Sequence, residues 1–478
     1  MAHTVLLLIA AVVTLLTWLL PAGQYDTLQY DASRNVFVRE GAEQTTYSAT
    51  THTLDSLGLN AELDKFTSGV IFKPIGIPGS YHRTEPKPQG LMALLQSPLK
   101  GITDAISVIL FVLFLGGTLG VVQSTGAIDA GVVSLAKILK GKEYLLIIIV
   151  TSLMAAGGTT FGLAEETVAF YPILLPIFLA AGYDALLTVG AIYGGSSIGV
   201  LASTVNPFST IIASDAAGIS WVDGIGLRMV MLIGGLIISI VYFLRYAKKI
   251  KKEENANANS HSADLAVLAV RQKLILIIFA ACFVVMIYGV SQLEWWFLEM
   301  STLFFAGALV IGFISSLGER SFITAFIDGA KDLLCVALII GLARGITILM
   351  QDGQIADTLL YRASQSVSGM PRGLFITVLT LLYSGLSLFI PSSSGMAVLT
   401  MPIFSPLADV VGIERSFIVD AYIFGQGLMG YVNPTGLILA SLAIVKIDFG
   451  KWFKFILPLI GMLFLLAVVI LLAGIYIF

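Results

Sequence analysis

The sequence predicts an all-α polytopic membrane protein with an inverted repeat, two re-entrant hairpins and two broken helices. Three observations predict this class. The chain of 478 residues is 57% hydrophobic and only 12% charged, with a mean hydropathy of +0.92, and soluble globular proteins carry far more charge. Its apolar runs approach the roughly 20 residues that a membrane-crossing helix needs. Two of these runs are also interrupted in the same way, by Val-Asn-Pro.

Composition excludes several classes of protein. A net charge of -3 and a pI near 5.8 give no electrostatic basis for binding nucleic acid. The sequence contains no Walker loop, dinucleotide fingerprint or zinc-type Cys/His spacing, so no organic cofactor is expected. Cys282 and Cys335 lie in apolar segments, and all four histidines lie in polar segments or at the N-terminus. We therefore expect neither a disulfide nor an intramembrane metal centre.

The elements follow in chain order from a first transmembrane span at residues 1–20. Its apolar run is read as a span because no basic segment precedes it, as one would in a signal peptide. The other parts are a polar extracytoplasmic loop or arm at 21–100, a first repeat at 101–247, a basic cytoplasmic loop at 248–271, scaffold spans at 272–327, a second repeat at 328–444 and a last span at 445–478.

Each repeat contains a predicted re-entrant hairpin, at 143–181 and at 373–411. In each hairpin two apolar runs are separated only by small or polar residues, "AAGGTTFG" (155–162) and "FIPSSSG" (389–395). One run of each pair is too short to cross a bilayer comfortably. Irregular backbone is tolerated at membrane depth when it is buried in protein, so we expect these two links to be hairpin tips.

A broken helix follows each hairpin, at 185–218 and at 415–444. The breaks fall at Asn206-Pro207 and Asn433-Pro434. Proline removes a backbone donor and clashes with the preceding turn, whereas Asn can hydrogen-bond the freed backbone groups. A single Asn-Pro would be an ordinary kink, but two at matched positions indicate a paired binding site.

Charge in the loops orients the spans, because positive residues accumulate on the cytoplasmic side. If both hairpins re-enter, fifteen lysines and arginines, including those of "RYAKKIKK" (245–252), fall on one side, and only Arg228, Arg362, Arg372 and Arg415 fall in the short loops of the other. We therefore predict nine full spans, with the N-terminus in the cytoplasm and the C-terminus outside.

An internal duplication supports this arrangement. "YPILLPIFLAAGYD" (171–184) aligns with "MPIFSPLADVVGIE" (401–414) at an offset of 230, and the two Asn-Pro pairs lie 227 apart. Gly101 and Asp104 correspond to Gly329 and Asp332 at an offset of 228. In the predicted topology the copies start on opposite sides, so the repeat is inverted. Inverted repeats with discontinuous helices are typical of secondary transporters, whose sites lie at the midplane.

Polar side chains at the tips and breaks are the candidate substrate-binding residues: Thr159, Thr160, Glu165, Glu166, Asn206, Ser392, Ser393, Ser394, Asn433 and Thr435. A carboxylate at membrane depth is costly and indicates function. Adjacent glutamates on a helix point about 100° apart, so one can face the site while the other caps a helix. The three serines either bind a ligand or cap the second limb.

Three further residues are candidate charge partners or polar contacts: Asp215, Arg344 and Gln426. Asp215 either joins the site or lies near the outer surface. Arg344, a cation well within a span, either binds an anionic group or neutralises an acid. The coupling ion, if one is used, is H⁺ or a Na⁺ held near Thr160, Asn206, Ser393 and Asn433.

Several motifs together resemble the YfcC family, which is related to ArcD-type basic amino acid antiporters and to AbgT and DcuC type carriers. They are "GGTTFGLAEETVAFYPI", "STVNPFSTIIA", "RYAKKIKK", "IPSSSGMAVLTMPIFSPLADVVGI" and "GSYHR". The resemblance implies a homodimer in the bacterial inner membrane, with a scaffold domain and a mobile transport domain that moves as an elevator. It also implies that substrate binds at Thr159, Thr160, Glu165, Asn206, Ser393 and Asn433. The Ser-Asn-Thr triplets of dicarboxylate carriers are absent from both tips.

The expected function is exchange of basic amino acids such as arginine, ornithine and lysine. Glu165 and Glu166 suit a cationic end, and hydroxyls with helix N-termini suit a carboxylate. One alternative is a Na⁺- or H⁺-coupled carrier of small carboxylates or other organic anions. A membrane enzyme using Ser392, Ser393 or Ser394 would lack an intramembrane His or Lys base, and a channel does not need two hairpins. The expected partners are the small-molecule substrate and membrane lipid.

Overall fold

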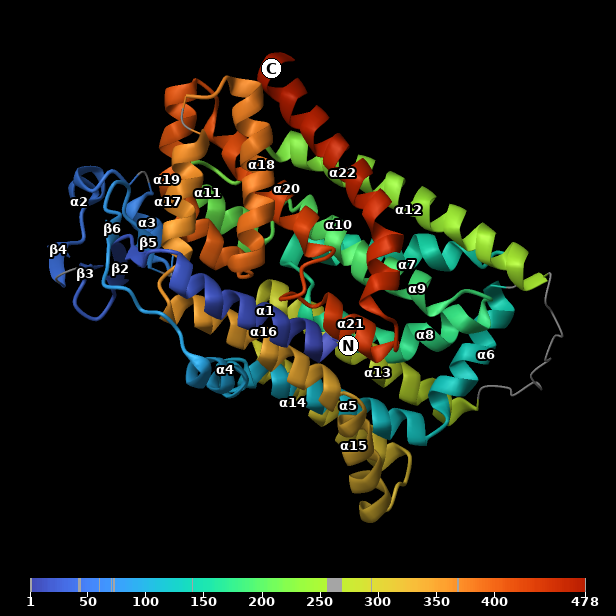
Figure 1. Ribbon diagram of the computed structural model, residues 1–478. Helices are drawn as coiled ribbons and strands as arrows, with labels where there is room; N and C mark the ends of the chain where they lie inside the picture. Colours follow the sequence, from blue (N-terminus) through green and yellow to red (C-terminus); the bar gives the residue numbers. More distant parts are fainter. Residues whose placement is uncertain are drawn as a thin grey trace.

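The computed structural model describes residues 2–477, except for 42–43, 60, 70, 72–73, 140, 256–268, 294 and 368. It is mostly helical, which confirms the helical class that was predicted (Figure 1). The helices of the first half are α1 (Ala2–Leu19), α2 (Thr51–Ser56), α3 (Leu63–Thr67), α4 (Leu91–Asp104), α5 (Ile106–Ser124), α6 (Ala127–Leu139), α7 (Tyr144–Phe161), η1 (Glu165–Phe170), α8 (Tyr171–Ala180), α9 (Ala185–Val189), η2 (Gly190–Gly194), α10 (Gly195–Leu201), η3 (Pro207–Ile211), α11 (Ile212–Ala217) and α12 (Ile225–Asn255).

The second half continues with α13 (Val270–Gln292), α14 (Phe297–Ile314), α15 (Glu319–Asp332), α16 (Leu334–Asp352), α17 (Ala356–Val367), α18 (Arg372–Phe389), α19 (Ser393–Val411), α20 (Arg415–Gly430), α21 (Ile438–Ile444) and α22 (Phe449–Ile477). Within the described residues, nine helices are long and apolar enough to cross a membrane. That set differs from the predicted nine spans, because it includes the hairpin limbs α7, α18 and α19 and leaves out the shorter α1, α9–α10 and α20.

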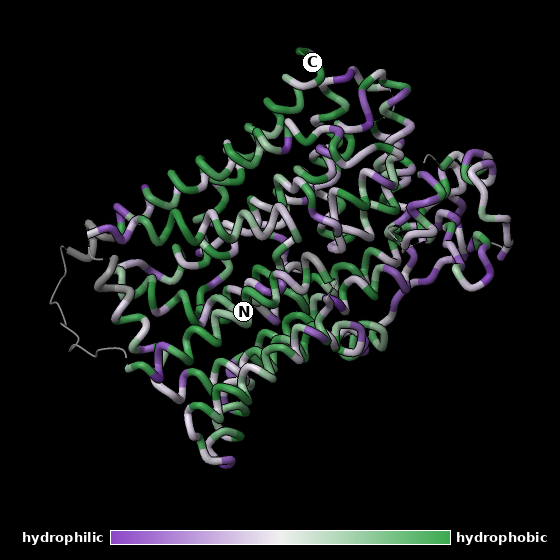
Figure 2. Tube along the Cα trace, turned by 180° about the vertical axis from the view of Figure 1, so that it is seen from behind, coloured by the Kyte–Doolittle hydropathy of each residue, from purple (hydrophilic) through white to green (hydrophobic). Residues whose placement is uncertain are grey.

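The polar segment after α1 folds into a small subdomain that contains the described strands. They are β1 (Gly23–Gln24), β2 (Thr27–Asp31), β3 (Val36–Glu40), β4 (Thr45–Ser48), β5 (Ile75–Gly76) and β6 (His82–Arg83). The larger sheet is antiparallel in the order β4-β3-β2-β5, and β1 pairs with β6. Hydrophilic residues gather on this subdomain, whereas the long helices are largely hydrophobic (Figure 2). An all-α description leaves these short strands out.

Two buried cores divide the helices into two bodies. The first core joins the hairpins, the broken helices, α12, α17 and α22, and it includes the polar subdomain; we call this part the hairpin body. The second core joins α1, α5, α13, α14 and α16, and we call this part the flanking body. The bodies meet at η1 and α21, because Val168, Ala169, Leu439 and Ala440 lie in the second core. In Figure 1 the hairpin α18–α19 stands above the layer formed by α1 and α16.

The helix starts repeat along the chain. Helices α15, α16 and α18 each begin 228 residues after α4, α5 and α7 respectively. The packing is reciprocal as well, because the first helix of each copy crosses the second helix of the other. A Cβ atom at Gly101 of α4 would lie 2.1 Å from the Gly341 carbonyl oxygen of α16, and one at Gly329 of α15 would lie 2.2 Å from the Gly116 carbonyl oxygen of α5. Glycine permits both close crossings.

The first hairpin turns at the C-terminal end of its predicted tip. The chain turns at 162–164, after α7 ends at Phe161, so the rest of the stretch 155–162 is helical. The glycines in that stretch serve a helix crossing, because a Cβ atom at Gly158 would lie 2.4 Å from the Ser196 carbonyl oxygen of α10. The turn begins at Gly162, whose φ of 74° is left-handed and favours glycine.

Two predicted boundaries also differ in the structure. Helix α4 begins at Leu91, inside the segment assigned to the polar loop, because its apolar side chains pack it against α16 while Leu91, Met92 and Leu95 stay exposed. Helix α12 continues to Asn255, so the basic sequence after 247 extends a helix before the loop begins. Long charged side chains are good helix formers, which explains the extension.

Candidate functional site

Both breaks use the same local structure. The Asn206 side-chain oxygen accepts a hydrogen bond from the Phe208 backbone N–H at 2.8 Å, and the Asn433 oxygen accepts one from the Thr435 N–H at 3.1 Å. In each case the donor is two residues after the Asn, across the proline. The side chain thus replaces the carbonyl that the interrupted helix no longer provides. This is the role expected for Asn in the Asn-Pro pairs.

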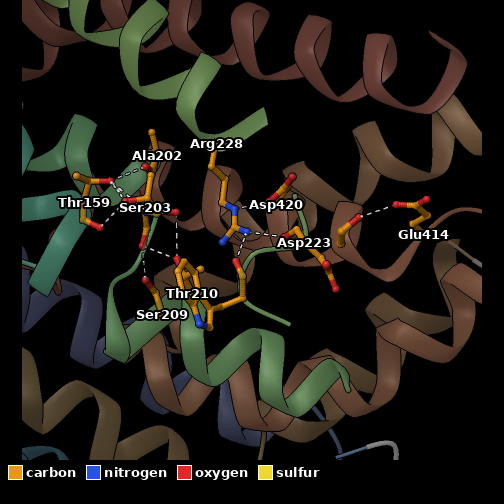
Figure 3. Close-up of polar contacts among 12 residues, drawn as sticks. Thr159, Ala202, Ser203, Ser209, Thr210, Asp223, Arg228, Glu414 and Asp420 are labelled. Atoms are coloured by element: carbon orange, nitrogen blue, oxygen red, sulfur yellow. Dashed lines mark hydrogen bonds and ion pairs between the residues drawn. The ribbon is translucent and has the colours of Figure 1, made fainter. Parts of the chain in front are cut away.

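Each break also contacts its own hairpin. A Cβ atom at Gly162, in the first tip, would lie 2.6 Å from the Asn206 side-chain nitrogen. The Asn433 side-chain nitrogen donates to the Ser387 carbonyl at 2.8 Å, near the end of α18. In the first hairpin the Thr159 hydroxyl donates to the Ala202 carbonyl at 2.8 Å (Figure 3). In each repeat, comparable contacts therefore hold the hairpin and its break together.

A cavity of about 580 Å³ lies where the two tips and the two breaks converge. Its lining includes ten of the predicted polar residues: Glu165, Glu166, Asn206, Arg344, Ser392, Ser393, Ser394, Gln426, Asn433 and Thr435. The walls also come from the flanking body, through the α4–α5 junction, α16 and the start of α14. The volume is in the range of small-molecule sites.

Acidic groups outnumber basic ones in the cavity. Among the described residues that line it, the ionisable acids are Asp104, Glu165 and Glu166, and the cation is Arg344. The Arg344 guanidinium already donates to the Asp104 carboxylate. One Glu166 oxygen accepts from the Ala164 N–H at 3.1 Å, so this glutamate caps the turn at the tip. The cavity therefore carries an excess of carboxylates that favours a cationic group.

The second tip presents the start of a long helix. Ser392 is the N-cap of α19, and its hydroxyl accepts from the Gly395 N–H at 3.1 Å. The Ser393 carbonyl accepts from the Tyr422 hydroxyl at 2.8 Å, which ties the tip to α20. The expected capping role of this tip therefore occurs at Ser392, which also lines the cavity, and ligand binding by the three serines stays a prediction.

Three predicted site residues do not line the cavity. Thr159 is buried against the first break, and the Thr160 hydroxyl donates to the Ala156 carbonyl of its own helix at 2.6 Å. Both positions follow from the later turn of the first hairpin, which leaves them within α7. Asp215 lies 3.4 Å from the Lys65 ammonium of the polar subdomain, because α11 leads away from the break toward that surface.

Sequence reasoning missed residues of two kinds. Asp104 lines the cavity, although it stands at the edge of an apolar run and was used only to align the repeat. Arg228 was counted in a loop, but it is fully buried in α12, with its Nε atom 3.2 Å from an Asp420 oxygen of α20 (Figure 3). Both charges stand at the ends of apolar runs, and this closeness to a span was the available signal. Trp295 and Trp296 also line the cavity.

Comparisons with known proteins agree with a transporter architecture. The family model of DcuC, a C4-dicarboxylate anaerobic carrier, matches residues 1–476. A Haemophilus influenzae protein named "Uncharacterized protein" is 44% identical over 98% of this chain and 96% of its own length. The Escherichia coli protein "Putative basic amino acid antiporter YfcC" is 30% identical over 98% of this chain and 94% of its own. The "Mg(2+)/citrate complex secondary transporter" of Bacillus subtilis is 22% identical over 79% and 88%.

These matches confirm the resemblance to YfcC, and the family and its named relatives are carriers, so the expectation of a transporter and not an enzyme is confirmed. The apolar helices make the chain a multi-pass membrane protein. Because the DcuC model covers nearly the whole sequence, the chain belongs to the DcuC family of membrane carriers.

Proposed function

We propose that the protein exchanges small amino acids with a cationic side chain, such as arginine, ornithine and lysine, across the bacterial inner membrane. The observation that carries the proposal is the cavity at both tips and both breaks, with three carboxylates and one already paired guanidinium. A dianion would meet net repulsion there, whereas a cation is attracted. The name of the E. coli relative, a basic amino acid antiporter, points the same way.

The two tips suit the two ends of such a substrate. The glutamates of the first tip are acceptors for an ammonium or guanidinium. At the second tip, the N-terminus of α19 offers backbone donors and a favourable dipole to the carboxylate. A substrate spanning the cavity thereby holds the hairpins of both repeats. Movement of the hairpin body against the flanking body, within a homodimer, would carry it across the membrane as an elevator.

Counterflow in proteoliposomes tests this function. Vesicles loaded with unlabelled arginine should accumulate labelled arginine, lysine and ornithine, and Glu165→Gln should reduce this exchange by tenfold or more, since a charge-assisted contact contributes about 1.5–3 kcal/mol. Glu166→Gln should reduce it as well. Glu319→Gln changes an exposed acid on α15 outside the cavity and should exchange normally. Unchanged arginine exchange in both cavity variants would refute the cationic assignment.

A second function is favoured by Arg344 and by the family description. The guanidinium lines the cavity, and the matching family is named for C4-dicarboxylates; release of Arg344 from Asp104 would let it hold a carboxylate, with Na⁺ or H⁺ offsetting the remaining acids. We propose Na⁺- or H⁺-coupled uptake of small carboxylates as this alternative. It predicts succinate or citrate uptake driven by a sodium or proton gradient, with Na⁺ near Asn206, Ser393 and Asn433. Exchange of arginine without either gradient would exclude it.

A further inference from the structure

One wall of the cavity is aromatic and comes from the turn between α13 and α14. Trp295, Trp296 and Phe297 all line the cavity. Local contacts hold this turn in place. The Trp295 ring lies directly over Gly289, where a Cβ atom would come within 2.2 Å of the indole, and the backbone N–H of Trp296 donates to a Glu299 carboxylate oxygen at 2.9 Å. Contacts with the end of α13 and the start of α14 therefore hold the two tryptophans in position.

This wall continues onto the first broken helix. The rings of Trp296 and Phe208 lie 5.5 Å apart between centroids, tilted by 53°, and Phe208 lines the cavity too. Phe208 is two residues after Asn206, whose side chain touches the first tip at Gly162. Glu165 follows Gly162 by three residues. Of this aromatic pair, Phe208 therefore stands on the segment that contacts the acidic tip, and Trp296 faces it from the turn between α13 and α14.

The Trp296 ring has free surface for a ligand. Trp296 is 53% exposed, although Phe208 and Phe297 both pack near it. Indole is the best aromatic partner for a cation. A guanidinium is planar and weakly hydrated, so it stacks on an aromatic face while its N–H groups bond a carboxylate in the plane; an ammonium is compact and strongly hydrated and gains less from such a wall.

We infer that Trp296, supported by Phe208, is a specificity-determining residue that makes the site prefer a guanidinium side chain to an ammonium one. The ring stacks against the guanidinium plane while the glutamates of the first tip accept its N–H groups. The inference rests on the proposed cationic substrate. It adds a ranking within that class, arginine above lysine and ornithine.

Exchange measurements with labelled arginine and labelled lysine in proteoliposomes test this ranking of substrates. Labelled arginine and labelled lysine are each exchanged by the wild type, by Trp296→Leu, by Trp296→Phe and by Phe208→Leu. Trp221→Leu is the control, since this tryptophan is outside the cavity lining. We expect Trp296→Leu to lower the apparent affinity for arginine about fivefold, the size of a cation–π contact, with a smaller loss for lysine. Trp296→Phe should retain most of the preference, and Phe208→Leu should weaken it.

The outcomes separate the inference from the function on which it rests. Continued lysine exchange by Trp296→Leu shows that the variant is folded, and loss of the arginine preference then supports the inference. Equal affinities for arginine and lysine in the wild type, or an unchanged ratio in Trp296→Leu, overturn the ranking and leave cationic exchange standing. Exchange of carboxylates alone by the wild type overturns both.

Discussion

Individual charged residues inside the apolar runs proved the most informative signal in the sequence. Glu165, Glu166 and Arg344 were singled out because charge at membrane depth is costly, and they line the cavity. Arg228 and its partner Asp420 are also charges buried within helices. Arg228 was missed because it stands close to a turn and was counted as a loop residue, so its pairing with Asp420 was missed as well. Trp296 could not be singled out, because aromatic residues are common throughout apolar segments and only the fold shows which of them face a cavity.

The buried pair of Arg228 and Asp420 should stabilise the hairpin body. The guanidinium also donates to the carbonyls of Trp221 and Asp223, at 2.6 and 2.5 Å. Arg228→Met should lower the melting temperature strongly, because an uncompensated buried carboxylate costs about 3–5 kcal/mol. The measurement is thermal melting of the detergent-solubilised protein followed by size exclusion.

Two further variants define the origin of that loss. Arg228→Met combined with Asp420→Leu should recover much of the stability, because the orphaned charge is gone. Lys331→Met breaks an exposed pair with Asp328, 3.0 Å apart, and should change stability by less than about 1 kcal/mol. A single Arg228→Met variant that melts with the wild type would contradict the assigned role.

At the scale of elements, the sequence predicted the second hairpin tip and both breaks well, because proline and serine interrupt the helical pattern there directly. It made the first tip too long because glycine has two uses, and only Gly162 of the stretch 155–162 lies in the turn. Gly157 and Gly158 looked like a turn, yet they lie inside α7, where Gly158 admits the backbone of α10. Composition alone does not separate a glycine that ends a helix from one that lets two helices approach.

The crossing of α5 and α15 provides a test of this second use. A Cβ atom at Gly329 would lie 2.2 Å from the Gly116 carbonyl oxygen and 2.7 Å from the Gly120 Cα atom. These are backbone atoms that cannot rotate away, so Gly329→Val should cost at least about 1–3 kcal/mol through overpacking. We expect a lower melting temperature and a reduced yield of monodisperse protein.

Gly461→Val is the matched control for this crossing. Gly461 also lies inside a helix, α22, but nothing is within 4 Å of an added Cβ atom. The same substitution there should therefore keep a melting temperature close to that of the wild type. Equal melting temperatures for the two variants would show that the close crossing contributes little to assembly.

For the whole molecule, the order of spans could be predicted but the grouping into two bodies could not. Which helices share a core depends on side-chain packing between segments far apart in the chain, such as α1 with α16, and one sequence gives no direct record of these contacts. The inverted topology, the cytoplasmic N-terminus and the homodimer stay predictions. The elevator motion stays a prediction as well, and the structure shows only that two large buried cores group the helices.

Cross-linking across the two bodies should stop transport. Phe170, beside the first hairpin tip, and Phe283 of α13 have ring centroids 4.9 Å apart. In a background with Cys282→Ala and Cys335→Ala, the pair Phe170→Cys and Phe283→Cys should lose exchange on treatment with a short bifunctional thiol reagent, because the hairpin body can no longer move, and regain it on reduction.

A cross-link within one body should have no such effect. Phe243 and Phe455, on α12 and α22, have stacked rings 6.1 Å apart, and both lie in the core of the hairpin body. Cysteines at these two positions should cross-link without loss of exchange. Full activity after complete cross-linking of the first pair would contradict a relative movement of the two bodies.

The polar subdomain also limits how far the hairpin body can move relative to the flanking body. It shares the core of the hairpin body, yet its chain leaves through residues 84–90, "TEPKPQG", into α4, which packs on α16 of the flanking body. Seven residues with two prolines extend to about 20 Å at roughly 3 Å per residue. At its other end the subdomain joins α1 of the flanking body through residues 20–22 alone, which is a shorter link. If the subdomain moves with the hairpins, these two links together limit how far it can travel, and shortening the 84–90 segment should leave binding intact while stopping the transport cycle partway.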